Sequence, residues 1–596
     1  MRSHVVTLYF FFSDALQSVI TALYCKIVVI LGLAFPMAEV VSNNVAPGYY
    51  QLFYVYLFLM SLIFLLAIYL DLWKSKAQWA CHKKRHHEDH TDGMFKLPRP
   101  RVHYGSFYLR LGAVLFGIGS MIYSGIEIGM FFELNMGHNA ECSNLFSVIR
   151  PLLQMIFVFV QMYFIFLNQK MNIYKNRFLS RFGLMHMIAT NLCVWLNVLI
   201  LETNHEIVDL HSAEHAKQQQ LDRRRDAHIE NDSESHNQTD SLFSPTAFDL
   251  NHLISQCQRN NNIMSNLLAK SGPFLFPCTI EYTLICAAVL FAMWKNIPEE
   301  HEHYKHHKRR KKISRSLALN TVLHDAESGA GENHELAHAH HKSAHHYSVD
   351  CANANTGLFS GIFVMVLVII SLIVFFVLIS SPDERLKKAA IEVASLTELA
   401  LYLITSIAVL IGMCQVSVKN LSKRRVQFEL FFPFQMRKLW YDNSANLCLD
   451  NLLLVVAQTG VFIYSAFCII GAFFQLEDHL LAFLASLATL VQTTLQTVFI
   501  LDSSSRFACT NDQVKRKPGR QVVTFLLVCN LAMWAINTLE TNRADSHPIQ
   551  VKFYGGEWAW PIITHVSMPL AIFYRFHSTV CLCEIWKKSF KFKNSS

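Results

Sequence analysis

The stretch NLCVWLNVLILETN, residues Asn191 to Asn204, recurs in related form as NLAMWAINTLETN at Asn530 to Asn542. In both stretches an Asn-Leu pair is followed by a Trp and then by Glu-Thr-Asn, with one residue fewer between Trp and Glu in the second. Both stretches lie in apolar segments long enough to cross a bilayer. The repetition predicts two copies of one membrane unit within the chain.

Two further correspondences flank this pair. Upstream, VFVQMYFIF around Gln161 matches TTLQTVFIL around Gln496, and downstream we align PCTIEY around Glu281 with PIITHV around His565. The last pair is separated by fewer residues than the others, and we attribute the difference to a longer loop in the first copy. This alignment places Glu281 and His565 at equivalent positions of the two repeats.

The composition is that of an integral membrane protein. Hydrophobic residues make up 52% of the 596 residues and charged residues only 16%, which is too apolar for a soluble fold of this size. The apolar runs are continuous, which indicates helices rather than barrel strands. We predict an all-α integral membrane protein with twelve transmembrane helices in two pseudo-symmetric six-helix halves. The predicted spans are 16–41, 49–73, 107–132, 149–168, 181–202, 273–296, 357–380, 389–416, 446–473, 480–502, 521–540 and 559–584.

Domain boundaries follow from these spans. Residues 1–296 form the first half, 297–356 a linker, and 357–596 the second half. Lys and Arg cluster in the loops on the side of the N-terminus, which predicts that both termini are cytoplasmic. The linker then faces the cytoplasm, and it contains eleven histidines between His301 and His346. Its composition predicts a mostly disordered segment.

The loop 203–272 is predicted to lie outside the cell. It is rich in Gln, Asn, Asp and His, and this composition again predicts mostly disordered chain. It carries two sequons, at Asn231 and Asn237, which are candidate glycosylation sites. Because such sequons also occur by chance, they only corroborate the predicted topology.

Three ionisable residues at bilayer depth are candidates for proton transfer or gating: Glu281, His565 and Glu398. An ionisable group within a membrane is costly unless it faces protein or water. Carboxyl and imidazole groups are also the side chains that change charge on acidification. The alternative is that each simply makes a hydrogen bond between helices.

Buried amides form a second candidate set: Gln161 and Asn191 in the first half, and Gln496 and Asn530 in the second. An amide does not titrate in the physiological range, but its donors and acceptor can hold water where helices meet. The alternative is that the amides join helices to each other. Their occurrence as one Gln and Asn pair per half favours two symmetric polar constrictions.

The motifs in spans three, five, six, nine and twelve together resemble the otopetrin family of proton channels. The resemblance implies a homodimer that is opened by external acid, is selective for H⁺ and is inhibited by Zn²⁺. We expect it in the plasma membrane, with no cofactor and no nucleic-acid partner, and we expect no enzymatic activity because the sequence has no HExxH, GxSxG or comparable motif. The resemblance also implies that Tyr574 joins the Gln and Asn pairs at the constriction. The motifs that carry it are HYGSFYLRLGAVLFGIGSMIYSGIEIG, NLCVWLNVLILETN, PFLFPCTIEYTLICAAVLFAMWKNI, LDNLLLVVAQ and WPIITHVSMPLAIFYRFHS.

The residues alone also favour protons as the permeant ion. A pore for Na⁺ or K⁺ needs rings of carboxylates or a carbonyl filter, and the predicted spans show neither pattern. A chain of waters held by amides and a few titratable groups would conduct H⁺. The alternative is a zinc or other metal-ion transporter, suggested by the His-rich linker, but such a transporter needs His and Asp ligands at helical spacing within the spans. No span supplies such a pair.

Overall fold

The structure is a computed structural model that describes residues 14–41, 50–85, 106–133, 145–167, 177–229, 263–297, 354–413, 439–441, 449–539, 548–554 and 558–591. Within these ranges, twelve helices are long and apolar enough to cross a membrane, which confirms the predicted number of spans. Their outward faces carry many exposed Leu, Ile, Val and Phe side chains, as expected of helices surrounded by lipid.

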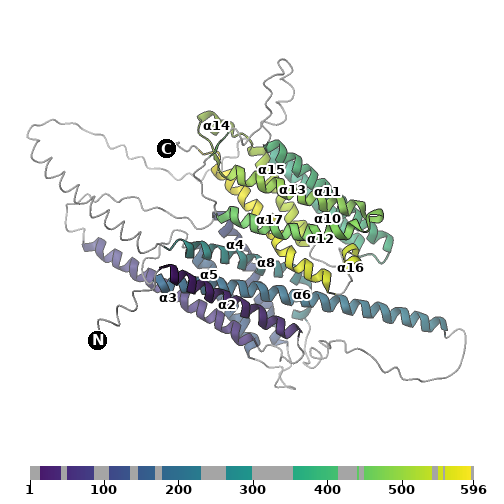
Figure 1. Ribbon diagram of the computed structural model, residues 1–596, viewed down its shortest axis with the longest axis horizontal. Helices are drawn as coiled ribbons and strands as arrows, with labels where there is room; N and C mark the ends of the chain where they lie inside the picture. The colour runs from purple at the N-terminus through teal and green to yellow at the C-terminus, as the bar shows by residue number, and fades with distance from the viewer. Residues whose placement is uncertain are drawn as a thin grey trace, which may run out of the picture.

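Six of these helices belong to the first half of the chain and six to the second, and Figure 1 shows the two groups as neighbouring bundles. The first group comprises α2 (Asp14–Val41), α3 (Gln51–Arg85), α4 (Phe107–Phe132), α5 (Phe146–Leu167), α6 (Arg177–Ile229) and α8 (Ile263–Lys295). The second comprises α10 (Asn355–Ile379), α11 (Glu384–Met413), α12 (Leu449–Phe473), α13 (Leu476–Ser504), α15 (Arg520–Leu539) and α17 (Ala559–Lys588).

The two halves repeat the same pattern of helix contacts. In the first half α2 packs on α6, α4 on α8, and α3 on α5, and in the second α10 packs on α15, α12 on α17, and α11 on α13. The contacts between the halves are also paired, because α17 packs on α6 and α4 while α8 packs on α15 and α12. This reciprocity is expected of parallel repeats related by an axis along the membrane normal.

Small elements complete the second half. The helix α14 (Asn511–Arg516) lies between α13 and α15, and the short strands β1 (Trp440–Tyr441) and β2 (Arg506–Phe507) pair antiparallel. The helix α16 (Pro548–Tyr554) precedes α17. The Tyr554 hydroxyl donates to the Phe467 carbonyl oxygen at 2.8 Å, and burial raises the pKa of this phenol above its ordinary value.

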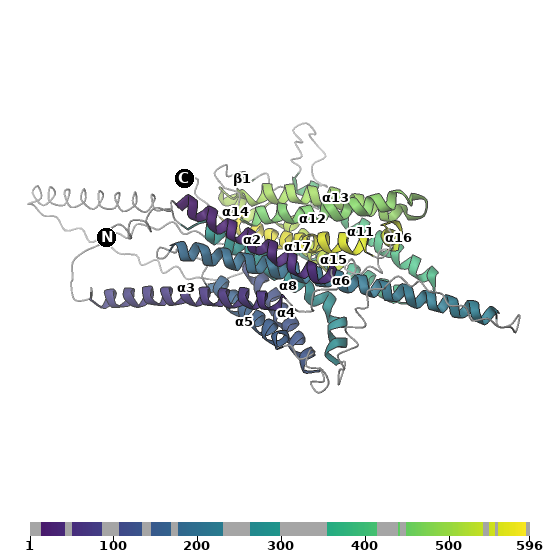
Figure 2. The same ribbon diagram turned by 60° about the horizontal axis from the view of Figure 1, so that its bottom comes forward.

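The prediction that the loop 203–272 is mostly disordered is wrong for the parts that the structure describes. The helix α6 continues to Ile229, well past the predicted end of its span, and α8 begins at Ile263. Residues 205–229 contain Ala, Leu, Gln, Glu and Arg but neither Gly nor Pro, a composition that favours helix. As a result α6 projects far beyond the bundle (Figures 1 and 2).

Candidate functional site

The first constriction consists of Gln161 on α5, Asn191 on α6 and Tyr282 on α8. The two amides are paired reciprocally: Gln161 Nε2 donates to Asn191 Oδ1 at 3.0 Å, and Asn191 Nδ2 donates to Gln161 Oε1 at 2.9 Å. Gln161 Nε2 also donates to the Tyr282 hydroxyl at 3.2 Å, and this hydroxyl donates to the Val158 carbonyl oxygen at 2.8 Å. All three side chains are fully buried, so the network joins three helices in the centre of the half.

The second constriction repeats this arrangement with Gln496 on α13, Asn530 on α15 and Tyr574 on α17. Gln496 Nε2 donates to Asn530 Oδ1 at 2.7 Å, and Asn530 Nδ2 donates to Gln496 Oε1 at 3.0 Å. The Tyr574 hydroxyl donates to the Thr493 carbonyl oxygen at 3.0 Å. Each tyrosine therefore donates to the carbonyl three residues before the glutamine of its own half.

This equivalence of Tyr282 and Tyr574 corrects the predicted alignment of α8 with α17. It aligns PCTIEY, residues 277–282, with PLAIFY, residues 569–574, so that Glu281 corresponds to Phe573. His565 lies eight residues before Phe573, which is about 12 Å along a helix. Glu281 and His565 are therefore not at equivalent positions, because the tyrosine hydrogen bonds fix a different register.

Glu281 is buried inside the first half, next in sequence to Tyr282. Its side chain is 1% exposed, and within the described residues neither carboxylate oxygen has a hydrogen-bond partner. A buried polar group is normally satisfied by protein or water. The carboxyl group is therefore a point at which water or a proton would be bound.

His565 lies instead at the contact between the two halves. Its Nδ1 atom is 3.0 Å from Glu206 Oε2, and its Nε2 atom is 3.8 Å from Glu202 Oε1. Nδ1 also lies 2.8 Å from the Pro561 carbonyl oxygen. Glu202 and Glu206 are one helical turn apart and present both carboxylates to the same side of α6. This cluster links α17 of the second half to α6 of the first, close to the end of the bundle from which α6 projects.

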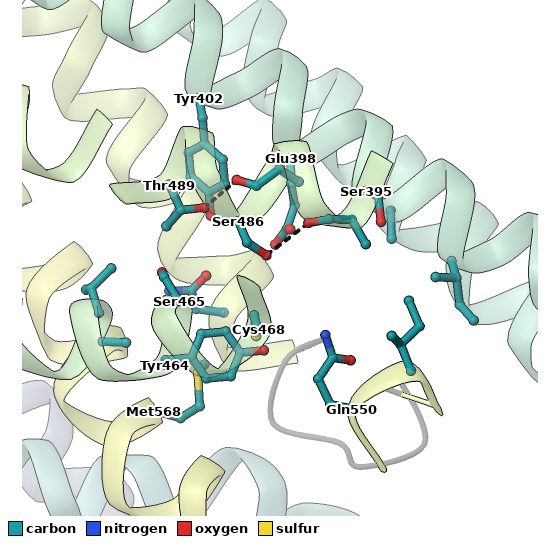
Figure 3. A pocket seen from close by; sticks show the side chains of 18 of the residues that line it. Ser395, Glu398, Tyr402, Tyr464, Ser465, Cys468, Ser486, Thr489, Gln550 and Met568 are labelled. Carbon is teal, nitrogen blue, oxygen red and sulfur yellow. Dashed lines mark hydrogen bonds between the residues drawn. The ribbon is translucent and has the colours of Figure 1, made fainter. Parts of the chain in front are cut away.

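Glu398 lies in neither of these places but lines a cavity of about 80 Å³ within the second half. In Figure 3, Glu398 and Tyr402 face Ser486 and Thr489 of α13, whose hydroxyls donate to carbonyls of their own helix. Arg575 also lines this cavity, so a carboxylate and a guanidinium share one space.

The guanidinium of Arg575 connects the cavity to the second constriction. This side chain is fully buried, and its Nη1 atom donates to Gln492 Oε1 at 2.7 Å. Gln492 Nε2 in turn donates to Gln496 Oε1 at 2.8 Å. The guanidinium carbon also lies 5.3 Å from the centres of the Tyr402 and Tyr574 rings. The second amide pair is therefore bonded to a buried cation.

The candidate glycosylation sites Asn231 and Asn237 lie outside the described residues, as does the His-rich linker. Tyr282, Gln492 and Glu206 are the site residues that the sequence analysis missed. A signal for Tyr282 was present, because Pro-x-x-Ile-x-Tyr occurs in both α8 and α17. Gln492 and Glu206 became recognisable only through their contacts.

These features define a class: an internally duplicated, twelve-helix membrane protein with one closed polar constriction in each half. Comparison with known proteins gives the family. The chain belongs to the otopetrin family, whose model matches residues 108–576. Members of this family are ion channels and not enzymes.

Three relatives illustrate the range of similarity. The chain is 45% identical to "Proton channel OtopLc" of Drosophila melanogaster, with 97% of this chain aligned to 36% of that protein. It is 22% identical to "Proton channel OTOP2" of Homo sapiens, covering 82% and 84% of the two chains, and 20% identical to "Proton channel OTOP1" of Danio rerio, covering 83% and 80%. The chain thus spans about a third of the length of the Drosophila relative and most of the length of the other two.

Proposed function

We propose that this chain is a proton-selective channel of the plasma membrane that conducts H⁺ into the cell and is activated by extracellular acid. The observation that carries the proposal is the pair of buried Gln, Asn and Tyr constrictions, one in each half. Names of the relatives support protons as the permeant ion. The twelve-helix fold supports a passage through the bilayer rather than a surface association.

The chemistry of the constrictions favours protons over larger cations. In each, two neutral amides bond reciprocally at 2.7–3.0 Å, and a phenol lies with them: the Tyr282 hydroxyl accepts from Gln161 at 3.2 Å, whereas the Tyr574 hydroxyl donates to the Thr493 carbonyl oxygen at 3.0 Å. A dehydrated Na⁺ or K⁺ ion needs several oxygen ligands to replace its water, and these oxygens already accept hydrogen bonds. A proton needs only a transient file of water molecules, which a small separation of the amides would admit.

The cluster of His565, Glu202 and Glu206 is the element that we propose for acid sensing. It joins the two halves, and acidification changes the charge of imidazole and carboxyl groups. Protonation of these groups would alter the attraction between α6 and α17, and thereby the packing of the halves. Glu281 and Glu398 are the proposed titratable groups within the first and second half, respectively.

Several further features belong to the same proposal. We assign residues 1–296 and 357–596 to the two halves and 297–356 to the linker, with both termini in the cytoplasm. A homodimer and inhibition by Zn²⁺ follow from the family resemblance.

The alternative of a zinc transporter depends on the linker histidines, and none of the constriction residues described above is a typical zinc ligand.

The proposal is tested by expressing the chain in cells that lack such a current and recording under voltage clamp. Lowering the external pH is expected to give an inward current that is absent from untransfected cells. If the protein reaches the cell surface and no acid-induced current appears, the proposed function is wrong.

A further inference from the structure

We infer that protons cross the membrane through the first half, and that Arg575 with Gln492 keeps the second half closed. This inference rests on the proposed function and adds the route. It follows from two differences between constrictions that are otherwise equivalent: the number of free acceptor positions and the charge beside the tyrosine.

The second constriction has no free acceptor position on its glutamine. Gln496 Oε1 accepts hydrogen bonds from both Asn530 Nδ2 and Gln492 Nε2, which occupies both lone pairs of this oxygen. Arg575 Nη1 donates a hydrogen bond to the side-chain oxygen of Gln492 and so holds this side chain in place. A bond to a charged donor is about twice as strong as a neutral one. Water therefore has to break a charge-assisted chain to reach this amide.

The first constriction lacks such a chain. With the spacing that aligns Gln161 with Gln496, the position of Gln492 is taken by Phe157, which cannot hydrogen-bond. Gln161 Oε1 accepts a hydrogen bond from Asn191, and the other group recorded beside Gln161 is the Cys286 thiol, which is only a weak donor, so water can take the second lone pair of this oxygen. The first amide pair can thus be hydrated without loss of an existing hydrogen bond.

The charges differ in the same direction. In the register set by the two tyrosines, Thr283 stands where the second half has Arg575, and Glu281 stands where it has Phe573. The first half therefore has a buried acid at the residue before its tyrosine, whereas the second has a buried cation at the residue after its tyrosine. A proton about 5 Å from a guanidinium is disfavoured by a factor of roughly 200 to 300 at an effective dielectric of about 20. Glu398, which shares the cavity with Arg575, offsets part of this repulsion.

Matched substitutions at the two glutamines test the inference. Methionine keeps the length of glutamine but cannot hold water, so we compare Gln161→Met with Gln496→Met by acid-induced current per surface protein. We expect the loss in Gln161→Met to exceed that in Gln496→Met at least fivefold. Equal losses, the reverse order, or no loss in either variant would overturn the inference. Wild-type current measured in parallel tests the proposed function separately.

A second pair keeps the test decisive if a methionine variant does not reach the surface. Thr283→Arg introduces into the first half the cation that the second half has, and Thr283→Gln is the control of similar length without charge. We expect the current per surface protein of Thr283→Arg to be at least tenfold below that of Thr283→Gln. Equal currents in the two variants would show that a cation beside this constriction does not block the route.

Discussion

Glu281 and His565 differ in what surrounds them, although both lie buried on helices that the duplication relates. Within the described residues the carboxylate of Glu281 has no hydrogen-bond partner, whereas His565 lies against two carboxylates of the other half. A buried group without a partner binds water or a proton, and a group between two halves reports their separation. We therefore expect substitutions at the two residues to affect proton current in different ways.

Replacing Glu281 by Gln keeps the shape of the side chain and removes its titration. Because Glu281 directly precedes Tyr282 in the sequence and its carboxyl group is buried without a hydrogen-bond partner within the described residues, we expect the external pH for half-maximal current to shift by about one unit, or the dependence on pH to flatten. The measurement is current against external pH, normalised to surface protein. Glu133→Gln, at the end of α4, is the matched control. Curves for Glu281→Gln that overlay wild type would show that this carboxyl group takes no part in conduction.

His565 and Glu206 are expected to act together, because Nδ1 and Oε2 are 3.0 Å apart. A double-mutant cycle of His565→Ala and Glu206→Gln measures their coupling through the pH of half-maximal current. Residues in direct contact typically couple by about 0.5–3 kcal/mol, so the double variant should differ from the sum of the single ones. Strict additivity would mean that the contact between the halves does not contribute to activation.

At the level of helices, close crossings hold each half together. Gly357 on α10 lies against α15, and a Cβ atom at this position would collide with the Gln521 carbonyl oxygen. A Cβ atom added at Gly125 on α4 would have no other atom within 4 Å. We expect Gly357→Ala to lower the free energy of unfolding by about 1–3 kcal/mol, and Gly125→Ala to leave it unchanged or raise it slightly. Thermal unfolding of the detergent-solubilised protein distinguishes the two, and equal melting temperatures would contradict the close approach of α10 and α15.

The membrane helices are the part of the fold that the sequence predicts best. Continuous apolar runs predicted the twelve spans, since a bilayer imposes length and composition on each helix directly. The amide pairs were recognisable because each repeat keeps a Gln and an Asn on consecutive helices. The alignment of Glu281 with His565 is wrong because the Pro-x-x-Ile-x-Tyr pattern that α8 and α17 share pairs Glu281 with Phe573. The contact of His565 with Glu206, and that of Arg575 with Gln492, depend on packing between helices distant in sequence, which no local pattern encodes.

For the whole molecule, duplication provides a symmetric scaffold and a few substitutions make it asymmetric. Corresponding helices pack in the same way in the two halves, and the same three side chains close each constriction. The first half has Thr283 and Phe157 at the positions equivalent to Arg575 and Gln492. The second half has Phe573 at the position equivalent to Glu281. We infer that one half was free to stabilise the assembly while the other carried the current.

We propose that the conducted ion is H⁺, and the reversal potential of the acid-induced current tests this most directly. For a proton-selective channel this potential moves by about 59 mV for each unit of pH difference across the membrane. Replacing external Na⁺ or K⁺ with a large organic cation should leave it unchanged. A reversal potential that follows the Na⁺ or K⁺ gradient and ignores the pH gradient would contradict the account.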